Sequence, residues 1–215
     1  MPFPKPTRIL RFIHVDNLEI YLGRQAIHAP NHAPDDGLTY RSNHNEAVQS
    51  KRRQFIIPCG PGGTIHDYVP FYFGPWSPMM LNLKTGRVPG YNEGQTPLIF
   101  LVSTAQAIEQ AGLPFVFSDG HGLAVFSAWF DDLSALDQLD WKVIVAKYWA
   151  DSMEDLDRKR RKQAEFLVYR SLAWDLIQSI TVIDAGRKAQ VEDMLARYPD
   201  AHHPPVNIKR DWYFS

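Results

Sequence analysis

Short apolar runs separated by polar connectors with glycine and proline recur along this chain. Runs of this kind are typical of buried strands. They predict strands at residues 8–15, 66–73, 98–102, 115–117, 165–169 and 177–182, with a last strand formed by 206–208 and 212–214. Apolar positions at helical spacing are fewer, so the pattern favours an α+β fold.

Several segments are predicted to be helical, among them short ones that begin at Asp16 and at Met79. Residues 104–110 form a helix that ends at Gly112, a residue type common just after a helix. Residues 187–198 place apolar side chains at helical spacing. Residues 153–162 are strongly charged and are expected to form a solvated helix.

The composition indicates one folded domain. The 215 residues include 12 Phe, 9 Tyr and 6 Trp, too many aromatic side chains for a disordered chain. The length suits a single domain spanning residues 1–215. We expect this domain to be monomeric.

The sequence also bears on the compartment. No stretch approaches the ~18 apolar residues needed to span a bilayer, and residues 1–6 lack the apolar run of a signal peptide. A single cysteine, Cys59, excludes an internal disulfide and a cysteine-built zinc site. We therefore expect a cytoplasmic protein that does not contact a membrane.

The most informative charged residue is Glu165, a lone carboxylate at the start of an apolar strand and directly after the basic run 158–162. A carboxylate in this place can act as a catalytic acid or as an electrostatic stabiliser at the edge of a cleft. It can equally be an edge-strand charge that faces water, and periodicity alone favours that second interpretation.

Other polar positions offer further chemistry. The polar stretch 28–54 is predicted to be a loop with a helical piece near 45–53, and a long loop in a compact domain is commonly functional. Within it, Arg53 can clamp a phosphate or a carboxylate bidentately, or be part of a solvated basic turn. His121 lies between two glycines on a turn, where it can meet a ligand or have no role.

Aromatic side chains and histidines complete the set. The aromatics of 66–73 can stack on unpaired bases, or pack into the core. His28, His32 and His44 have spacings that fit no familiar ligand pair, so no metal site is predicted.

Taken together, six segments resemble the DarT family of bacterial toxins, which ADP-ribosylate DNA. They keep their order over nearly the whole chain: residues 14–18 (HVDNL), 61–73 (PGGTIHDYVPFYF), 111–117 (AGLPFVF), 148–151 (YWAD), 162–168 (KQAEFLV) and 209–213 (KRDWY). Each match alone is weak, but six in register are strong.

The resemblance implies an ADP-ribosyltransferase fold, with two packed, mostly antiparallel sheets around a cleft for NAD and with peripheral helices. It implies sequence-selective transfer of ADP-ribose from NAD to a base of single-stranded DNA, thymine in the best-known branch, with release of nicotinamide. NAD is then a co-substrate, no metal is needed, and a macrodomain antitoxin is the expected partner.

The resemblance also assigns residues. Glu165 matches the catalytic glutamate and Arg53 the essential arginine; residues 35–53 match the NAD-binding loop and residues 121–165 the substrate-binding loop region. Cofactor contacts are expected from Leu10, Arg11, Phe12, His14, Asn17, Ile27 and Arg53, and substrate contacts from Lys51, Arg52, Tyr72, His121, Tyr148 and Trp149.

Three positions differ from the family pattern. Arg11 stands where a histidine is common, and Ile13 follows where a threonine is common. Trp76 stands where an arginine is common. An arginine at position 11 suits the adenylate or phosphate end of NAD.

Charge limits how nucleic acid can be bound. The balance of 23 Lys+Arg against 24 Asp+Glu argues against sequence-blind coating of nucleic acid. The local basic groups 51–53, 158–162 and 209–210 still suit contact with a few nucleotides, so we expect modest DNA affinity with selectivity from base contacts. The alternatives are a transferase of the same fold acting on another base, RNA or protein, and a non-enzymatic nucleic-acid-binding module.

Overall fold

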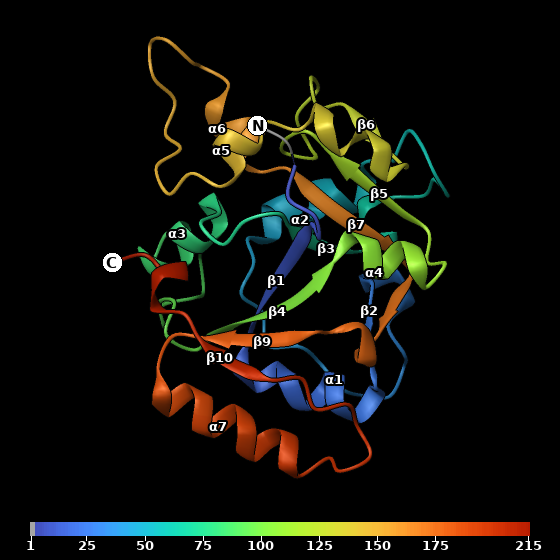
Figure 1. Cartoon of the computed structure of the whole chain (residues 1–215), viewed down its shortest axis with the longest axis vertical. Coiled ribbons are helices and arrows are strands. Elements are labelled where there is room, and N and C mark those ends of the chain that lie inside the picture. The colour runs from blue at the N-terminus through green and yellow to red at the C-terminus, as the bar shows by residue number, and fades with distance from the viewer. Residues whose placement is uncertain (1–2) are drawn as a thin grey trace.

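A computed structural model describes residues 3–215 and shows a sheet of eight strands in the order β10-β9-β4-β1-β3-β7-β5-β6 (Figure 1). The strands are β1 (Arg8–His14), β3 (Tyr68–Tyr72), β4 (Leu98–Thr104), β5 (Phe115–Ser118), β6 (Trp129–Phe130), β7 (Glu165–Tyr169), β9 (Ser179–Val182) and β10 (Val206–Ile208). Neighbouring strands are antiparallel, except that β9 and β10 are parallel.

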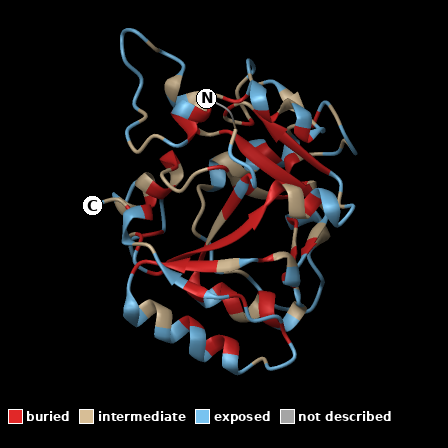
Figure 2. Ribbon diagram, viewed as in Figure 1, coloured by how far each residue is buried: buried red, intermediate tan, exposed pale blue. Residues whose placement is uncertain are grey.

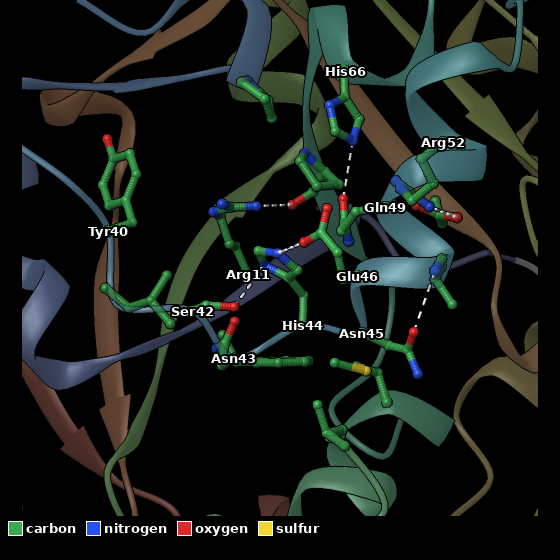
Figure 3. Close-up of a pocket in the computed structure, with 18 of the residues that line it drawn as sticks. Arg11, Tyr40, Ser42, Asn43, His44, Asn45, Glu46, Gln49, Arg52 and His66 are labelled. Atoms are coloured by element: carbon green, nitrogen blue, oxygen red, sulfur yellow. Dashed lines mark hydrogen bonds and ion pairs between the residues drawn. The ribbon is translucent and has the colours of Figure 1, made fainter. Parts of the chain in front are cut away.

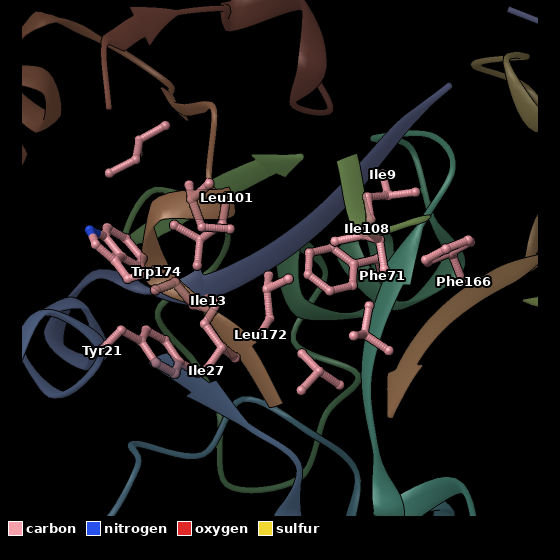
Figure 4. Packing of buried hydrophobic residues seen from close by; sticks show 14 of the residues in the cluster. Ile9, Ile13, Tyr21, Ile27, Phe71, Leu101, Ile108, Phe166, Leu172 and Trp174 are labelled. Carbon is pink, nitrogen blue, oxygen red and sulfur yellow. The ribbon is translucent and has the colours of Figure 1, made fainter. Parts of the chain in front are cut away.

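The sheet carries apolar clusters on both of its faces. Along β1, Ile9 and Ile13 join the largest core cluster, which also includes Phe71 of β3 and Phe166 of β7 (Figure 4). Leu10 points the other way, into a second cluster. Because successive side chains of a strand alternate between faces, the continuous apolar runs of the sequence follow from burial on both sides. Figure 2 shows the resulting concentration of buried residues along the strands.

The large sheet is nearly interrupted between β1 and β3. β1 pairs with β4 over its whole length, from Arg8 to His14, but it pairs with β3 at the single position Leu10–Tyr72. β3 in turn pairs with β7 throughout, and this register sets Tyr72 opposite Glu165. The sheet therefore opens between β1 and β3, close to the first residue of β7.

Helices cover the sheet and its edges. They are α1 (Leu18–Arg24), α2 (Glu46–Gln54), α3 (Pro78–Lys84), α4 (Ala105–Gln110), α5 (Trp141–Ile144), α6 (Arg158–Lys162) and α7 (Ala185–Ala196). Short 3-10 helices occur at Val15–Asn17, Pro30–His32, Ile65–Asp67, Leu133–Gln138, Trp174–Leu176 and Arg210–Trp212. The longest helix, α7, packs on β9 and β10 and contacts α1 (Figure 1).

A second, smaller sheet consists of two strands, β2 (Ala26–His28) and β8 (Ser171–Ala173). Ile27 and Leu172 lie opposite each other in it, and both are fully buried in the largest core cluster. The small sheet contacts β3 and β7 of the large one. The expected α+β fold with two sheets is thus confirmed, with sheets of very different size.

Most predicted elements are confirmed, and the exceptions have local causes. The helix predicted at 153–162 begins only at Arg158, because Asp155 accepts a hydrogen bond from the main chain of Asp157 and turns the chain there. Residues 210–212 form a 3-10 helix where a strand was expected. Strands β2, β6 and β8 were not predicted. Within residues 3–215, no helix is long and apolar enough to cross a lipid bilayer.

Replacement of Phe166 tests the aromatic packing under β7. The ring is fully buried and stacks on Phe115, with 5.0 Å between ring centroids. Phe166→Ala is expected to lower the free energy of unfolding by about 3–5 kcal/mol because it leaves a cavity, as measured by urea denaturation. The matched control Val125→Ala, at a side chain that is 92% exposed, should change it by less than about 0.5 kcal/mol. A similar small effect of both variants would contradict this assignment of the core.

Candidate active site

A cavity of about 890 Å³ opens where β1 and β3 separate. Arg11 and Tyr72 line it from these strands, and Gln49 and Arg52 line it from α2. The segment from Tyr40 to Asn45 and helix α3 form further walls (Figure 3). Its volume lies within the range of small-molecule and cofactor sites, about 300–1,000 Å³.

Glu165 lies in this cavity as the first residue of β7. Its register opposite Tyr72 places it at the end of the strand beside the opening in the sheet. The residue is only 4% exposed. The interpretation of Glu165 as a solvated edge-strand charge is therefore wrong, because the carboxylate is buried among polar groups.

Arg52 is the ionic partner of this carboxylate. Its Nη1 donates to Glu165 Oε1 at 2.9 Å and its Nη2 donates to Oε2 at 2.8 Å, a bidentate pair between two buried residues (Figure 3). Helix α2 supplies the arginine from its last turn, and Asn45 caps the start of the helix by accepting from the main chain of Ala47 and Val48. Arg52 thus reaches Glu165 from a capped helix with a defined position.

The ion pair with Arg52 keeps Glu165 ionised. Burial acts to raise the pKa of the carboxyl, but the charge and the hydrogen bonds of Arg52 outweigh it, so the pKa lies below its usual range. The main-chain N–H of Gly122 also donates to Oε1, at 3.3 Å. Glu165 is therefore ionised near neutral pH.

His121 and Gly122 lie close to this carboxylate. A Cβ on Gly122 would lie 3.0 Å from Glu165 Oε1, so a side chain there would crowd the carboxylate. Gly120 instead lies close to Arg160, whose Nη1 would be 2.3 Å from a Cβ at that position. Burial lowers the pKa of His121, so the ring is neutral near pH 7. Its Nδ1 accepts from the main chain of Leu123 at 3.2 Å, which assigns the ring proton to Nε2.

Arg11 contrasts with Arg52. It lines the cavity from β1, and its Nη1 donates to the carbonyl of Pro70 at 3.1 Å, across the opening between β1 and β3. Its buried Nε finds no hydrogen-bond partner, and no carboxylate pairs with it, within residues 3–215. A cation held in this way can accept an anionic ligand.

The structure brings most of the predicted site residues together. The cavity is lined by Arg11, Phe12, Asn17, Arg52, Arg53, Tyr72, His121 and Glu165. Tyr72 stacks on Phe12, with 5.8 Å between centroids, and burial raises the pKa of its hydroxyl to about 12. The phenol is therefore neutral and the two rings form one aromatic surface of the cavity.

Three predicted cofactor contacts lie elsewhere. The side chains of Leu10 and Ile27 are core residues, 2% and 0% exposed, because each points from its strand into an apolar cluster. His14 is also buried, beside Asp16 and Glu93 rather than in the cavity. The side chains of these three residues therefore do not line the cavity, and their expected contact with the cofactor stays a prediction.

The structure distinguishes Arg52 from Arg53. The arginine that pairs with Glu165 is Arg52, whereas Arg53 is exposed and forms no ion pair with another residue of the described part of the chain. Helical periodicity does not separate them, because both arginines line the cavity, at spacings of three and four from Gln49. Burial against Glu165 separates them, and the role expected of Arg53 stays a prediction.

Three predicted substrate contacts lie outside the cavity. Lys51 is exposed on the far side of α2, and Tyr148 and Trp149 belong to the loop between α5 and α6. Tyr148 is 82% exposed. These residues can meet only a ligand that extends beyond the cavity.

The basic run 158–162 is mostly engaged within the protein. Arg160 pairs with Asp119 and Asp157, and Arg161 pairs with Asp140 and Asp155. Lys162 is buried and donates to the carbonyls of Ile144 and Ala146 at 2.6 and 2.7 Å. Of this run, only Lys159 lines the cavity. The run is therefore mainly a structural element.

Several cavity residues had no distinguishing sequence signal. Gln49 and His66 form a hydrogen-bonded pair at 3.1 Å inside the cavity, and Asn31, Tyr40 and Gln163 also line it. Among residues 3–215, no three histidine, cysteine, aspartate or glutamate side chains are grouped to hold a metal ion.

Comparisons with known proteins agree with one another. A family model described as "ssDNA thymidine ADP-ribosyltransferase, DarT" matches residues 10–214. A DNA ADP-ribosyl transferase of Thermus sp. (strain 2.9) is 42% identical over 212 residues, which are 99% of this chain and 98% of that protein.

Solved structures give the same result. Thermus sp. 2.9 DarT in complex with ADP-ribosylated ssDNA superposes with a TM-score of 0.93 at 42% identity, over 100% of this chain and 99% of that one. Thermus sp. 2.9 DarT in complex with NAD+ superposes with a TM-score of 0.87 at 42% identity, over 99% and 100% of the two chains.

Replacement of Glu165 should reveal the buried pair in the pH dependence of stability. The pKa of Glu165 is lower in the folded state than its ordinary value of 4.5, so the ionised pair stabilises the fold above that value. This stabilisation is lost as the pH falls through the folded-state pKa. At pH 7, Glu165→Gln leaves Arg52 buried without a carboxylate and is expected to cost about 3 kcal/mol.

Urea denaturation of both proteins at pH 7, 5 and 3 measures this effect. The difference in unfolding free energy should shrink below about pH 4.5, because the unfolded carboxyl then takes up a proton that the paired carboxyl of the folded state binds less readily. A constant difference across the three pH values, or a variant as stable as the wild type at pH 7, would contradict the assignment.

Proposed function

The chain belongs to the DarT family of single-stranded-DNA thymidine ADP-ribosyltransferases, and from that premise we propose that it transfers ADP-ribose from NAD to thymine in single-stranded DNA and releases nicotinamide. NAD-dependent DNA ADP-ribosylation is the activity that its relatives and their complexes support. The observation that carries the proposal is the ionised Glu165 in the cavity, held by Arg52.

Glu165 suits the first chemical step. When the bond between nicotinamide and ribose breaks, nicotinamide takes the electron pair and positive charge develops on the sugar. A carboxylate that is already ionised and oriented stabilises this charge without reorganisation. The depressed pKa of Glu165 and its bidentate bond to Arg52 supply both conditions.

Arg52 takes the role that the resemblance gave to Arg53. It fixes both oxygens of Glu165 from one direction and leaves their remaining lone pairs for a ribose hydroxyl or a base. Arg53 is one residue farther along α2 and lines the cavity with a guanidinium that forms no ion pair among residues 3–215. It is placed to contact a phosphate of NAD or DNA.

Thymine fits the second step. Its N3 carries a proton that has to leave as the nitrogen attacks the sugar, and a carbonyl flanks the nitrogen on each side. Glu165 can accept the proton, and the neutral His121 can donate from Nε2 to one of the carbonyls. A base without a second carbonyl beside that nitrogen would lose one such contact.

NAD contacts follow from the cavity lining. Arg11 presents an unpaired cation for the pyrophosphate, and Phe12 with Tyr72 presents an aromatic surface. Asn17 lines the same cavity. We assign residues 35–53 to NAD binding and residues 121–165 to DNA binding, within one domain that spans the chain.

Residues outside the cavity would read the flanking nucleotides. Lys51, Tyr148 and Trp149 are placed to contact DNA that leaves the cavity, and base stacking on exposed aromatic rings suits single strands. Sequence selectivity would then arise from these contacts. The biological setting proposed from family membership is a cytoplasmic toxin controlled by a macrodomain antitoxin.

Mass spectrometry of oligonucleotides tests the reaction. Short single strands of varied sequence are incubated with NAD and the protein. Each carries thymine, cytosine, adenine or guanine at one test position and no thymine elsewhere. ADP-ribose is expected on the thymine strands only, and Glu165→Ala should bind NAD without modifying any strand. Modification of RNA or protein in parallel samples, or of another base, would replace the proposal by the related transferase; binding without NAD consumption would replace it by a non-enzymatic module.

The neighbouring arginines give a matched pair of variants. Arg52→Ala leaves Glu165 unoriented and is expected to lower kcat by about 100-fold or more, as for removal of a preorganised stabilising donor. Arg53→Ala should instead raise KM and reduce the salt dependence of DNA binding by about one phosphate contact. Steady-state kinetics at two salt concentrations measures both effects. A larger loss of kcat in Arg53→Ala than in Arg52→Ala would reverse the two roles.

A further inference from the structure

The segment 36–45 forms an outer wall of the cavity with little apolar support. Tyr40, Ser42, Asn43 and His44 line the cavity from this segment (Figure 3). None of its ten positions is buried, and Leu38 is 52% exposed. Tyr40 alone packs on the core, against Tyr21 with 5.1 Å between ring centroids. Polar contacts therefore have to hold most of this wall in place.

Arg24, the last residue of α1, supplies most of these contacts. Its Nε and Nη2 donate to the two carboxylate oxygens of Asp36 at 2.8 and 2.6 Å, and Nη2 also donates to the Leu38 carbonyl at 3.3 Å. Its Nη1 donates to the Tyr40 hydroxyl at 2.8 Å, and the guanidinium lies 5.3 Å from the centre of that ring. One side chain, only 6% exposed, thus binds three alternate residues of the wall.

Arg41, the residue after Tyr40, is held at the N-terminal end of α1. Asn17, directly before α1, accepts from the main-chain N–H of Arg41 at 2.7 Å and donates to its carbonyl at 2.9 Å. The Arg41 side chain bonds to Asp16 and Glu93. Residues 36–41 are thus fixed along α1 from its C-terminal end to its N-terminal end.

Arg24 does not itself line the cavity. Any influence on a ligand has to pass through the wall that it holds. A wall that is already folded spares the ligand the cost of ordering it, and this raises affinity without changing the chemical step.

We propose that Arg24 and Asp36 form a latch that fixes residues 36–41 on α1 and thereby preorganises the cavity for NAD. Arg24 is a positioning residue: it acts on NAD affinity through the wall and contacts neither NAD nor the reacting atoms. This role rests on the proposed function, since NAD is the ligand it serves. The Arg24 hydrogen bonds lower the pKa of Asp36 to about 2, so the latch is ionised throughout the physiological range.

Calorimetric titration of NAD into variants tests the latch. Arg24→Gln and Asp36→Asn should each raise the Kd for NAD by about tenfold or more, the effect of a lost charge-assisted bidentate contact. The double variant should bind no more weakly than the weaker single variant, because both changes break the same contact. At saturating NAD, kcat of Arg24→Gln with a thymine-containing oligonucleotide should stay within about twofold of the wild-type value.

Two controls separate the latch from a general effect on the fold. Arg197→Gln removes an exposed arginine that joins α7 to Glu19 on α1, away from the wall, and should leave the Kd for NAD unchanged. Hydrogen exchange should show lost protection in residues 36–45 of Arg24→Gln, with the central strands still protected. Arg24→Lys keeps the charge without the forked donors and should fall between wild type and Arg24→Gln.

The outcomes also separate the latch from the proposed function. An unchanged Kd with unchanged protection of 36–45 in Arg24→Gln would overturn the latch, as would a drop in kcat with no change in Kd. Additive effects in the double variant would show that Arg24 and Asp36 act separately and would overturn it too. Failure of the wild-type protein to bind NAD would instead overturn the proposed function, and with it the role of the latch in NAD binding.

Discussion

The buried ion pair between Arg52 and Glu165 sets conditions that the surrounding structure has to meet. Two charges withdrawn from water cost several kcal/mol each unless they bond to one another with good geometry. The bidentate contact requires α2 to present Arg52 toward the first residue of β7. It also requires a residue without a side chain at position 122, where a Cβ would crowd Glu165. The cap of α2 and the glycine of the 120–122 turn thus serve the same pair.

The ion pair between Arg52 and Glu165 lines the cavity at the opening between β1 and β3. The two strands meet only at Leu10 and Tyr72, and the cavity lies where they part. Two arginines line the cavity, and they differ in their hydrogen-bond partners. Arg52 is fully engaged with a carboxylate, whereas Arg11 spans the opening to a main-chain carbonyl and keeps an unpartnered Nε, within the part of the chain that the structure describes. The arginine that orients the carboxylate and the arginine with donors left for an anion are therefore two different residues.

Apolar periodicity predicted the longer strands of the large sheet, because burial on both faces produces continuous apolar runs such as 98–102 and 165–169. It could not predict β2, β6 and β8, which are only two or three residues long and gain their stability from contacts with other strands. Sequence resemblance pointed to Glu165, which lies in the cavity, and to Arg53 rather than Arg52. Consecutive residues of a helix point about 100° apart, so only the structure shows that Arg52 is buried against Glu165 and that Arg53 is exposed. The side chains of Leu10 and Ile27 lie in the core, since successive residues of a strand alternate between its two faces.

Although the chain carries almost equal numbers of acidic and basic residues, many of its basic side chains are bonded within the protein. The run 158–162 looks in the sequence like a strip for binding phosphates, yet Arg160 and Arg161 are bonded to aspartates. Lys162 is withdrawn beneath α5, where burial lowers its pKa to about 7. These cations bond to the loop between α5 and α6, to α5 and to Asp119 after β5, and they are not free to neutralise DNA. Cations left for a ligand, such as Arg11, Arg53 and Lys159, instead line the cavity. An anionic ligand would therefore meet its cationic partners inside the cavity.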